Sequence, residues 1–339
     1  MSQAPNIAIV GATGEVGKAI IAQLEEAELE LGILIAVASE RSIDETLMFR
    51  GRPVLLNEVG DFDFAKVQIA VFAVPAEVAE EYVPQALAAG CVVIDHSKAF
   101  RFSPEATLAV AGLNIESLPA GQRLFACADA TTATVAPLLG ALNARAGLSR
   151  IQMTVLRAVS AAGQGGIREL AKQTGELLNA RGIDSAVFPQ QVAFNVLPLV
   201  GEVDVAGRGP AEAAIADELR DLLGRPDLPV DVTCVTVPVF FGHAVSLSVE
   251  TEQELGLAEA VHILSEIEGV ELQIDANDQG VATPVTDAAG RDAVYVSRLR
   301  EASSGPQGLQ AWIVADNVRQ GAARHSVETV KKVIKDFKY

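Results

Sequence analysis

The sequence predicts an α/β fold with two domains, and three observations lead to that prediction. The chain has 339 residues, of which 50% are hydrophobic, which is enough for two separate cores. In its first part, short β-branched runs alternate with helical patterns, as is typical of a parallel sheet. From about Arg150 onward, longer segments alternate apolar and polar residues. This pattern favours an α+β domain whose mixed or antiparallel sheet is covered on one face.

The first part opens with a strand, a glycine turn and a helix. The β-branched run 6–10 predicts the strand, and Ile20, Ile21 and Leu24 follow at helical spacing after the turn. Further strands are expected at 33–38, 69–74 and 91–94, and a helix is expected over 76–89. Strands joined by crossover helices in this way predict a Rossmann-like, dinucleotide-binding sheet.

The second part contains longer predicted strands and two turn-rich links. The strands are expected at 151–159, 232–240 and 245–250, and the links at 204–210 and 275–280. The final segment, 316–337, predicts a helix with one apolar stripe. That stripe consists of Val318, Ala322, Val327, Val330, Ile334 and Phe337.

The charge balance narrows the classes of partner. A formal net charge of −18 repels phosphate backbones and anionic lipid, so neither nucleic acid nor a membrane is expected as a partner. The sequence has no apolar run long enough to span a membrane and no basic start typical of a secretory signal, so a cytoplasmic protein is expected. Its three cysteines and four histidines are too few and too scattered for a disulfide framework or a structural zinc site, and no metal is expected.

The glycine turn carries the first candidate site. Its spacing, G-x-x-G-x-x-G, departs from the usual G-x-G-x-x-G, but it lies between a strand and a helix as a pyrophosphate loop does. We expect backbone N–H groups here to hold a dinucleotide, and a tight turn without a ligand is the alternative. The candidate residues are Gly11, Thr13, Gly14, Glu15, Val16 and Gly17.

A second candidate segment follows the second strand, where dinucleotide-binding domains bind the adenosine ribose. Ser39, Arg41 and Ser42 provide one guanidinium and two hydroxyls, which suit the 2′-phosphate of NADP. NADP is therefore favoured over NAD. Alternatively, Arg41 pairs with acidic neighbours in a surface cluster formed by Glu40, Asp44 and Glu45.

Five further segments, together with the glycine loop, give the chain a family resemblance. They are Ser97-Lys98-Ala99-Phe100-Arg101, Ala158-Val159-Ser160-Ala161-Ala162-Gly163, Ala193-Phe194-Asn195-Val196-Leu197-Pro198, Val237-Pro238-Val239-Phe240-Phe241-Gly242-His243 and the run from Trp312 to Ala323. In this order they resemble the aspartate-semialdehyde dehydrogenase family, and within it the Usg-type homologues that lack the catalytic cysteine. The resemblance covers essentially the whole chain.

The resemblance implies a domain division and an assembly. It implies an NADP-binding domain over 1–130 that is completed by a returning C-terminal helix over 317–339, with Asn317 near the cofactor. It implies a substrate and dimerisation domain over 131–316. It also implies a homodimer or a dimer of dimers, with a small-molecule ligand that the sequence does not identify.

The family reaction is the NADP-dependent interconversion of aspartyl phosphate and aspartate semialdehyde, run through a cysteine thioester with a histidine as acid and base. The family cysteine lies in a motif of the form A-N-P-N-C-S-T. This chain reads Ala126-Cys127-Ala128-Asp129-Ala130-Thr131-Thr132, so Ala130 stands at the nucleophile's position. The resemblance places the histidine at His243. A methyl group forms no thioester, so the covalent route is absent.

Other substrate-side positions differ as well. By resemblance, Thr236 stands where an arginine binds the substrate carboxylate, and Arg157 stands where a glutamine orients the reacting group. The family's E-x-K pair appears here as Glu212 and Ala214, so the glutamate is kept and the phosphate-binding lysine is lost. By the same resemblance, Arg101 is a phosphate-binding residue that this chain retains. In an emptied pocket Glu212 is expected to pair with Arg101 or with Arg157.

The sequence leaves three hypotheses about function open, and it does not decide whether the chain is an enzyme. In the first hypothesis, the chain is an inactive pseudoenzyme that keeps cofactor binding. In the second, it is an oxidoreductase that uses Arg157 and His243 on another carbonyl substrate without a thioester. In the third, it is a non-catalytic dimerisation partner. Replacement of the nucleophile by Cys127 is disfavoured, because that residue is expected to lie in a strand. Thr131 or Thr132 is expected to cap a helix over 134–144.

Overall fold

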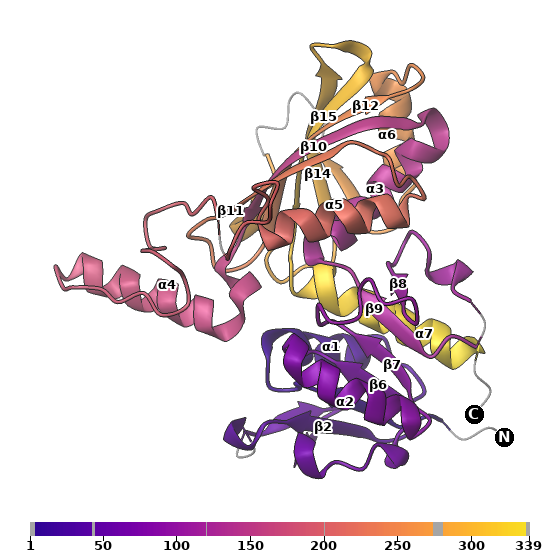
Figure 1. Ribbon diagram of the computed structural model, residues 1–339, viewed down its shortest axis with the longest axis vertical. Coiled ribbons are helices and arrows are strands. Elements are labelled where there is room, and N and C mark those ends of the chain that lie inside the picture. Colours follow the sequence, from indigo (N-terminus) through magenta and orange to yellow (C-terminus); the bar gives the residue numbers. More distant parts are fainter. Residues whose placement is uncertain (1–3, 43–44, 120, 200, 274–280, 337–339) are drawn as a thin grey trace. The chain divides into compact units, whose positions relative to one another are not determined.

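The computed structural model describes residues 4–42, 45–119, 121–199, 201–273 and 281–336. The chain divides into two compact units, one formed by Met1–Ala128 with Ala322–Tyr339 and the other by Asp129–Gly321 (Figure 1). The predicted link at 275–280 and the residues Asp44 and Phe337 lie outside the described part of the chain.

The first unit is built on a seven-stranded sheet with the order β5-β2-β1-β6-β7-β9-β8, in which all strand pairs are parallel. The strands are β1 (Ile7–Val10), β2 (Leu34–Ala38), β5 (Leu56–Glu58), β6 (Ile69–Phe72), β7 (Val92–Asp95), β8 (Thr107–Ala109) and β9 (Leu124–Cys127). A separate hairpin joins β3 (Leu47–Phe49) and β4 (Arg52–Val54). This arrangement confirms the predicted Rossmann-like sheet.

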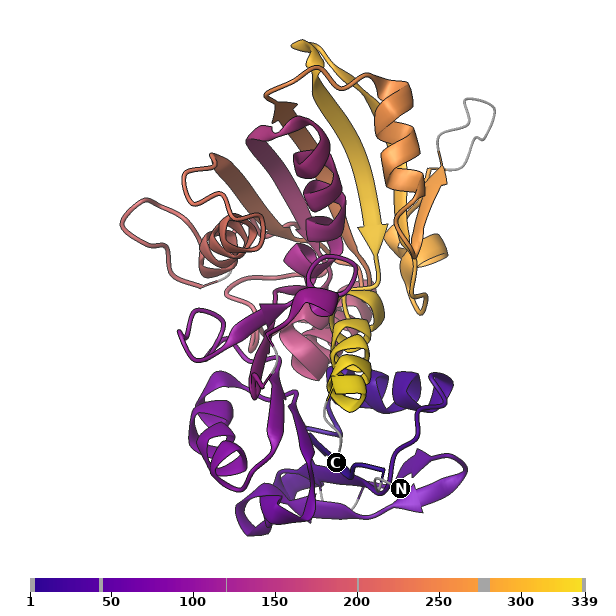
Figure 2. The ribbon, with the colours of Figure 1, turned by 90° about the vertical axis from the view of Figure 1, so that its right-hand side faces the viewer.

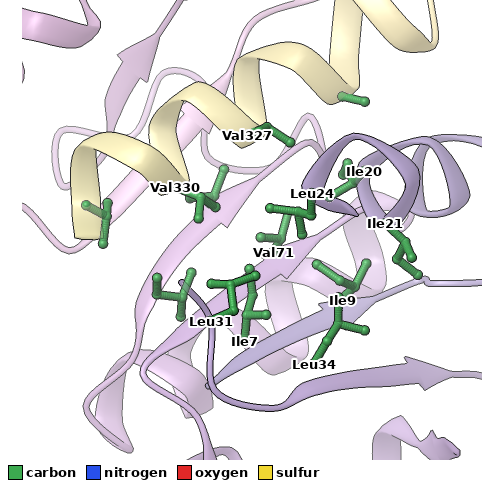
Figure 3. Packing of buried hydrophobic residues seen from close by; sticks show 14 of the residues in the cluster. Ile7, Ile9, Ile20, Ile21, Leu24, Leu31, Leu34, Val71, Val327 and Val330 are labelled. Atoms are coloured by element: carbon green, nitrogen blue, oxygen red, sulfur yellow. The ribbon is translucent and has the colours of Figure 1, made fainter. Parts of the chain in front are cut away.

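Helices cover both faces of this sheet. On one face, Ile7 and Ile9 of β1 pack with α1 (Glu15–Glu26) and α7 (Arg324–Asp336), as Figure 3 shows. On the other face, Ala8 and Val10 pack with α2 (Ala76–Ala88). The alternation along β1 therefore supplies two cores, which is why its residues are apolar throughout. Short helical turns are η1 (Glu40–Ser42), η2 (Val59–Asp61), η3 (Phe64–Lys66) and η4 (Ile115–Ser117).

The strand order places a switch point beside β1. This strand pairs with β2 on one side and with β6 on the other, and the chain fills the sheet outward in both directions from it. Ligands of open α/β sheets bind outside the carboxyl ends of the strands at such a point. The loop at Gly11, directly after β1, lies there.

The second unit is built on a mixed six-stranded sheet with the order β11-β10-β12-β15-β14-β13. The strands are β10 (Leu148–Arg157), β11 (Val230–Thr236), β12 (His243–Thr251), β13 (Val270–Gln273), β14 (Val294–Ala302) and β15 (Gly305–Ala315). The pairs β10–β11 and β13–β14 are parallel and the other pairs are antiparallel. The predicted mixed or antiparallel sheet is confirmed in its mixed form.

Three helices pack on one face of this sheet, and a fourth projects from it (Figures 1 and 2). They are α3 (Ala130–Ala146), α5 (Pro210–Leu222), α6 (Leu257–Ser265) and the projecting α4 (Gly163–Leu178). Met153 on the covered face of β10 is buried, whereas Gln152 and Thr154 on the other face are exposed. This alternation is the pattern that predicted a sheet with one covered face.

Two predicted elements end earlier or begin later than expected. The strand predicted over 232–240 ends at Thr236, because the chain reaches Pro238, which has no N–H to continue the ladder. The helix predicted over 316–337 begins as a π-turn, η7 (Arg319–Ala323), and becomes α-helical only at Arg324. The remaining helical turns of this unit are η5 (Val159–Ala162) and η6 (Pro284–Ala288).

Candidate functional site

The glycine loop has the geometry that close approach to a phosphate requires. Gly11 has a φ of 84°, and a Cβ on it would lie 2.2 Å from the Ala73 carbonyl oxygen, so no larger residue fits. A Cβ on Gly17 would lie 2.2 Å from the Gly11 carbonyl oxygen. Gly14 ends the turn as the N-cap of α1. The loop therefore brings backbone and the N-terminus of α1 together at the switch point, which fits a dinucleotide pyrophosphate.

The remaining loop candidates, Thr13, Glu15 and Val16, lie in the turn and in the first turn of α1. Ser39 and Arg41 are exposed and Ser42 is half-buried, in and beside the turn η1 after β2. Glu45, one of the acidic residues considered as a partner of Arg41, forms an ion pair with Lys18, whose Nζ lies 3.2 Å from its carboxylate. The three residues lie at the carboxyl end of β2, on the edge of the sheet that binds nucleotides in such folds.

Arg101 lies in the first unit, half-buried, in the turn that follows β7. Burial raises the pKa of the neighbouring Asp95, and the bonds from Ser97 and the charge of Arg101 oppose that rise. Burial, assisted by the charge of Arg101, lowers the pKa of His96 to about 3. Arg101 therefore places a fixed positive charge at the carboxyl edge of the parallel sheet.

Cys127 ends β9 and points into the core of the first unit. Its side chain is 1% exposed, and its Sγ lies 3.9 Å from the Ser326 Oγ, which also contacts His96 Nε2. Burial raises the pKa of this thiol to about 12. A protonated, enclosed thiol of this kind is not a nucleophile.

Ala130 is the first residue of α3, and the residue before it caps the helix. The Asp129 carboxylate accepts a hydrogen bond from the Thr131 N–H at 2.9 Å. The expectation that Thr131 or Thr132 caps a helix over 134–144 is therefore wrong, because Asp129, an equally good capping residue, comes earlier and starts the helix at Ala130. The half-exposed Ala130 methyl group lies at the end of the helix where a thiolate would be stabilised.

Three sequence-predicted residues meet on the helix-covered face of the second sheet. Arg157 of β10 lies in register with Thr236 of β11. On the other side, Leu156 lies opposite Ala244, so Arg157 and His243 are neighbours across β10 and β12. Thr236 is buried, and its backbone bonds with Leu197 in both directions. The structure thus brings Arg157, Thr236 and His243 together.

Arg157 is held by an ion pair. One of its terminal nitrogens lies 3.3 Å from the Asp129 carboxylate, and the two side chains are only 18% and 10% exposed. The Cys234 thiol also acts on the Arg157 guanidinium. Burial opposes the charge of Arg157, but Asp129, Cys234 and the buried Glu218 together raise its pKa above the ordinary value. The guanidinium is therefore a permanent cation with a fixed internal partner.

His243 is buried and electrically neutral. Its side chain is 5% exposed, and neither ring nitrogen has a hydrogen-bond partner among the described residues. Burial lowers the pKa of His243 to about 3, the charge of Arg157 lowers it further, and Asp129 opposes the shift. An unpartnered buried polar group costs about 1–3 kcal/mol, so the imidazole leaves one hydrogen-bond donor and one acceptor for a ligand or a water molecule to satisfy.

Glu212 does not pair with Arg157, because both of its carboxylate oxygens bind backbone. They accept hydrogen bonds from the Gly209 N–H at 2.7 Å and from the Cys234 N–H at 2.9 Å. The first contact lets the Glu212 side chain satisfy the N–H of the N-cap residue at the start of α5, and the second fixes α5 to β11. The expected pairing of Glu212 with Arg157 is wrong, since these backbone donors satisfy the carboxylate.

Asn317 lies in the second unit, where its amide holds the site together. Its oxygen accepts from the Gly242 N–H at 3.0 Å, and its nitrogen donates to the Ser160 Oγ at 3.0 Å. It thereby ties the turn before His243 to the turn η5 after Arg157. Contact of Asn317 with a cofactor stays a prediction.

Sequence reasoning missed three residues of this cluster. Asp129 had a signal, because an Asp directly before a helical pattern is an N-cap candidate. Cys234 lies two residues before Thr236 and therefore on the same face of β11. Glu218, which is fully buried and accepts from the Asp129 N–H at 2.9 Å, had none, because only the packing of α5 brings it there.

The described residues contain neither a candidate metal site nor a candidate membrane-spanning helix. No group of three or more histidine, cysteine or acidic side chains within them could hold a metal ion. No helix among them has the length and apolar character needed to cross a membrane.

The chain is similar to known proteins over nearly its whole length. Residues 6–120 match the family model described as semialdehyde dehydrogenase, NAD binding domain, and residues 138–320 match the one described as semialdehyde dehydrogenase, dimerisation domain. The first match confirms the predicted nicotinamide dinucleotide cofactor.

Individual relatives agree with these models. Aspartate-semialdehyde dehydrogenase 2 of Vibrio cholerae is 36% identical, over 99% of this chain and 100% of the relative. The USG-1 protein homolog of Pseudomonas aeruginosa is 37% identical, over 99% and 100%. The crystal structure of aspartate semialdehyde dehydrogenase II from Vibrio cholerae, complexed with ASA, matches with a TM-score of 0.95 at 36% identity, over 99% of this chain and 100% of that one.

Proposed function

The chain belongs to the semialdehyde dehydrogenase family, as the resemblance predicted, and from this premise we propose that it binds a nicotinamide dinucleotide but does not catalyse the thioester reaction of aspartate-semialdehyde dehydrogenases. One observation carries the proposal. Ala130 is the first residue of α3, at the helix N-terminus that would activate a nucleophilic thiol.

The loss of a nucleophile is a large effect. Removing the nucleophile of a covalent mechanism costs roughly 10⁶-fold in rate. No described thiol offers a replacement, because burial raises the pKa of Cys91 to about 11 and the pKa of Cys127 and of Cys234 to about 12. The charge of Arg157 opposes the rise for Cys234 but does not overcome it, so Cys234 is a neutral thiol rather than a thiolate.

The retained half of the function is dinucleotide binding. Gly11, Gly14 and Gly17 leave room for a pyrophosphate at the N-terminus of α1, and Ser39, Arg41 and Ser42 favour the 2′-phosphate of NADP over the ribose of NAD. A bound nicotinamide ring would supply hydride transfer. The chain's own residues would position it, with Arg101 contributing a positive charge at the same edge of the sheet.

We further propose that the protein is a homodimer, on the support of its match to a dimerisation domain. A cytoplasmic location stays a prediction of the sequence.

The test compares turnover with binding in the same preparation. The purified chain is assayed with aspartate semialdehyde, phosphate and NADP, and NADPH and NADH are titrated in parallel by nicotinamide fluorescence. We expect no turnover above background and saturable NADPH binding that is tighter than NADH binding. Robust turnover contradicts the loss of the thioester route, and the absence of binding for both nucleotides contradicts the retained function.

A second candidate is an oxidoreductase that reduces another carbonyl substrate directly, with His243 as hydrogen-bonding partner. The unpartnered ring nitrogens of His243 favour it. This candidate also requires Arg157 to bind a substrate anion, and the ion pair between Arg157 and Asp129 argues against that role. NADPH consumption across a panel of carbonyl acids and uncharged aldehydes distinguishes the two candidates.

A further inference from the structure

The N-terminus of α3 and Arg157 together form what would ordinarily be an anion site. The first N–H groups of a helix point outward along its axis and attract negative charge. Arg157 adds a guanidinium at the same end, on a side chain that is 18% exposed, and arginine binds carboxylate and phosphate groups well. A free site of this composition would take a small anion.

This end of the helix, however, already carries its own anion. The Asp129 carboxylate accepts from the Thr131 N–H at 2.9 Å and lies 3.3 Å from the Arg157 guanidinium. Glu218, fully buried, bonds the Asp129 N–H and adds a second negative charge near Arg157. The Asp129 carboxylate therefore already takes the place of an external anion, and any further anion would have to compete with it for the Arg157 guanidinium and the helix N–H groups.

A separate observation points to a ligand at this site. His243 is nine-tenths buried, and it faces Arg157 and Asp129 closely enough for both charges to act on it, yet neither ring nitrogen has a partner among the described residues. A neutral imidazole offers one donor and one acceptor. These are hydrogen-bonding groups for a ligand that needs no positive partner.

We propose that Asp129 is a specificity-determining residue that occupies the anion site at the N-terminus of α3, so that this end of the site excludes phosphate and carboxylate groups and takes a ligand part without negative charge, hydrogen bonded to His243. The inference deepens the proposed function, on which it rests for the identity of the site. A site of this kind prefers a neutral ligand, whereas a reaction of acyl phosphates requires a site that binds an anion.

Asp129 offers a clean substitution. Asparagine caps helices as well as aspartate does, so Asp129→Asn keeps the acceptor for the Thr131 N–H and removes only the charge. Serine at 129 is a second neutral cap. The matched control is Asp231→Asn, which removes the partner of Arg150 in an exposed ion pair between the same two strands, β10 and β11.

The experiment measures binding of inorganic phosphate and of succinate to the full-length chain by calorimetry, and by thermal shift at constant ionic strength. We expect no saturable binding by the wild type or by Asp231→Asn. Asp129→Asn and Asp129→Ser are expected to bind phosphate saturably and at least roughly tenfold more tightly than the wild type, because each variant removes the carboxylate that pairs with the Arg157 guanidinium. The double variant Asp129→Asn with Arg157→Gln is expected to lose that binding.

Two outcomes overturn the proposal. One is a folded Asp129→Asn or Asp129→Ser protein that binds phosphate no better than the wild type. The other is phosphate binding by the wild type that Arg157→Gln abolishes, a result that does not depend on the folding of the Asp129 variants. Because the readout needs neither turnover nor dinucleotide, these failures are distinct from failure of the proposed function.

Discussion

Gly321 lies directly against Ala130, at the start of α3. A Cβ on Gly321 would be 2.7 Å from the Ala130 Cβ, 3.0 Å from its carbonyl oxygen and 3.1 Å from its Cα. The π-turn Arg319–Ala323 thus packs on the first turn of α3, and Gly321 makes that approach possible.

Gly321→Ala is therefore expected to destabilise the second unit. The added methyl meets backbone, which cannot rotate away, and overpacking of this kind costs about 1–3 kcal/mol. Urea unfolding followed by circular dichroism measures the change. Gly175→Ala in α4 is the control, since its Cβ would meet no atom within 4 Å, and it is expected to leave stability unchanged or raise it by up to about 1 kcal/mol. Equal stability of the two variants contradicts the close packing.

The native thiols are expected to resist alkylation. Cys91 donates to the Phe64 and Val67 carbonyls at 3.3 Å, and burial raises its pKa to about 11, while burial raises the pKa of Cys127 and Cys234 to about 12. At pH 8 the reactive thiolate is then about a thousandth or less of each. Mass spectrometry after iodoacetamide treatment is expected to show no modification of the native protein and three modifications after unfolding. Rapid native modification of Cys234 would instead identify it as an activated thiol.

Ala130→Cys is expected to add one readily alkylated thiol. The new side chain would lie half-exposed at the N-terminus of α3, where the helix dipole lowers a thiol pKa, although the charge of Asp129 opposes that effect. Adding Asp129→Asn is therefore expected to increase the alkylation rate at pH 7. A thiol at 130 as inert as Cys127 contradicts the activating role of this helix end.

Local patterns predicted the first unit well because each of its elements depends on nearby residues. The apolar run at β1, the glycine turn and the spacing of Ile20, Ile21 and Leu24 are all local signals, and the sheet follows from them. The same reasoning predicted a helix over 134–144, shortly after Ala130. It placed the cap at the wrong residue because Asp129 and Thr131 are both acceptable caps by type.

The charge pattern of the second site could not be predicted from local signals. The pairing of Arg157 with Asp129 depends on how β10 meets the start of α3, and Glu218 arrives from the middle of α5. Glu212 was expected to pair with an arginine, but the Gly209 and Cys234 N–H groups satisfy it. These contacts arise from tertiary packing, which residue type and spacing do not specify.

Gly17→Ala is expected to abolish dinucleotide binding together with the local structure that supports it. The added Cβ would lie 2.2 Å from the Gly11 carbonyl oxygen and 2.9 Å from the Ala12 Cα, so the loop must move away from the sheet edge. We expect a loss of about 3 kcal/mol or more in stability of the first unit. Gly60→Ala in the same unit is the control, because its nearest contacts would be 3.9 Å and 4.0 Å from side-chain ends. Unchanged NADPH binding by Gly17→Ala contradicts the assignment of the loop.

His243 is expected to make the second unit sensitive to acid. Burial lowers its pKa from 6.5 to about 3 in the folded chain, so between these pH values the unfolded state binds a proton that the folded state does not. Stability is therefore lost as the pH falls from about 6.5 toward 3, by up to roughly 1.4 kcal/mol per pH unit for this group, and the group contributes no pH dependence above that window. His96, whose pKa is also lowered to about 3, adds a similar slope from the first unit. Urea unfolding at several pH values between 4 and 7 is expected to show a shallower slope for His243→Leu than for the wild type, while the exposed control His262→Gln keeps the wild-type slope. A wild-type slope in His243→Leu would show that the imidazole is already protonated, or already partnered, in the folded protein.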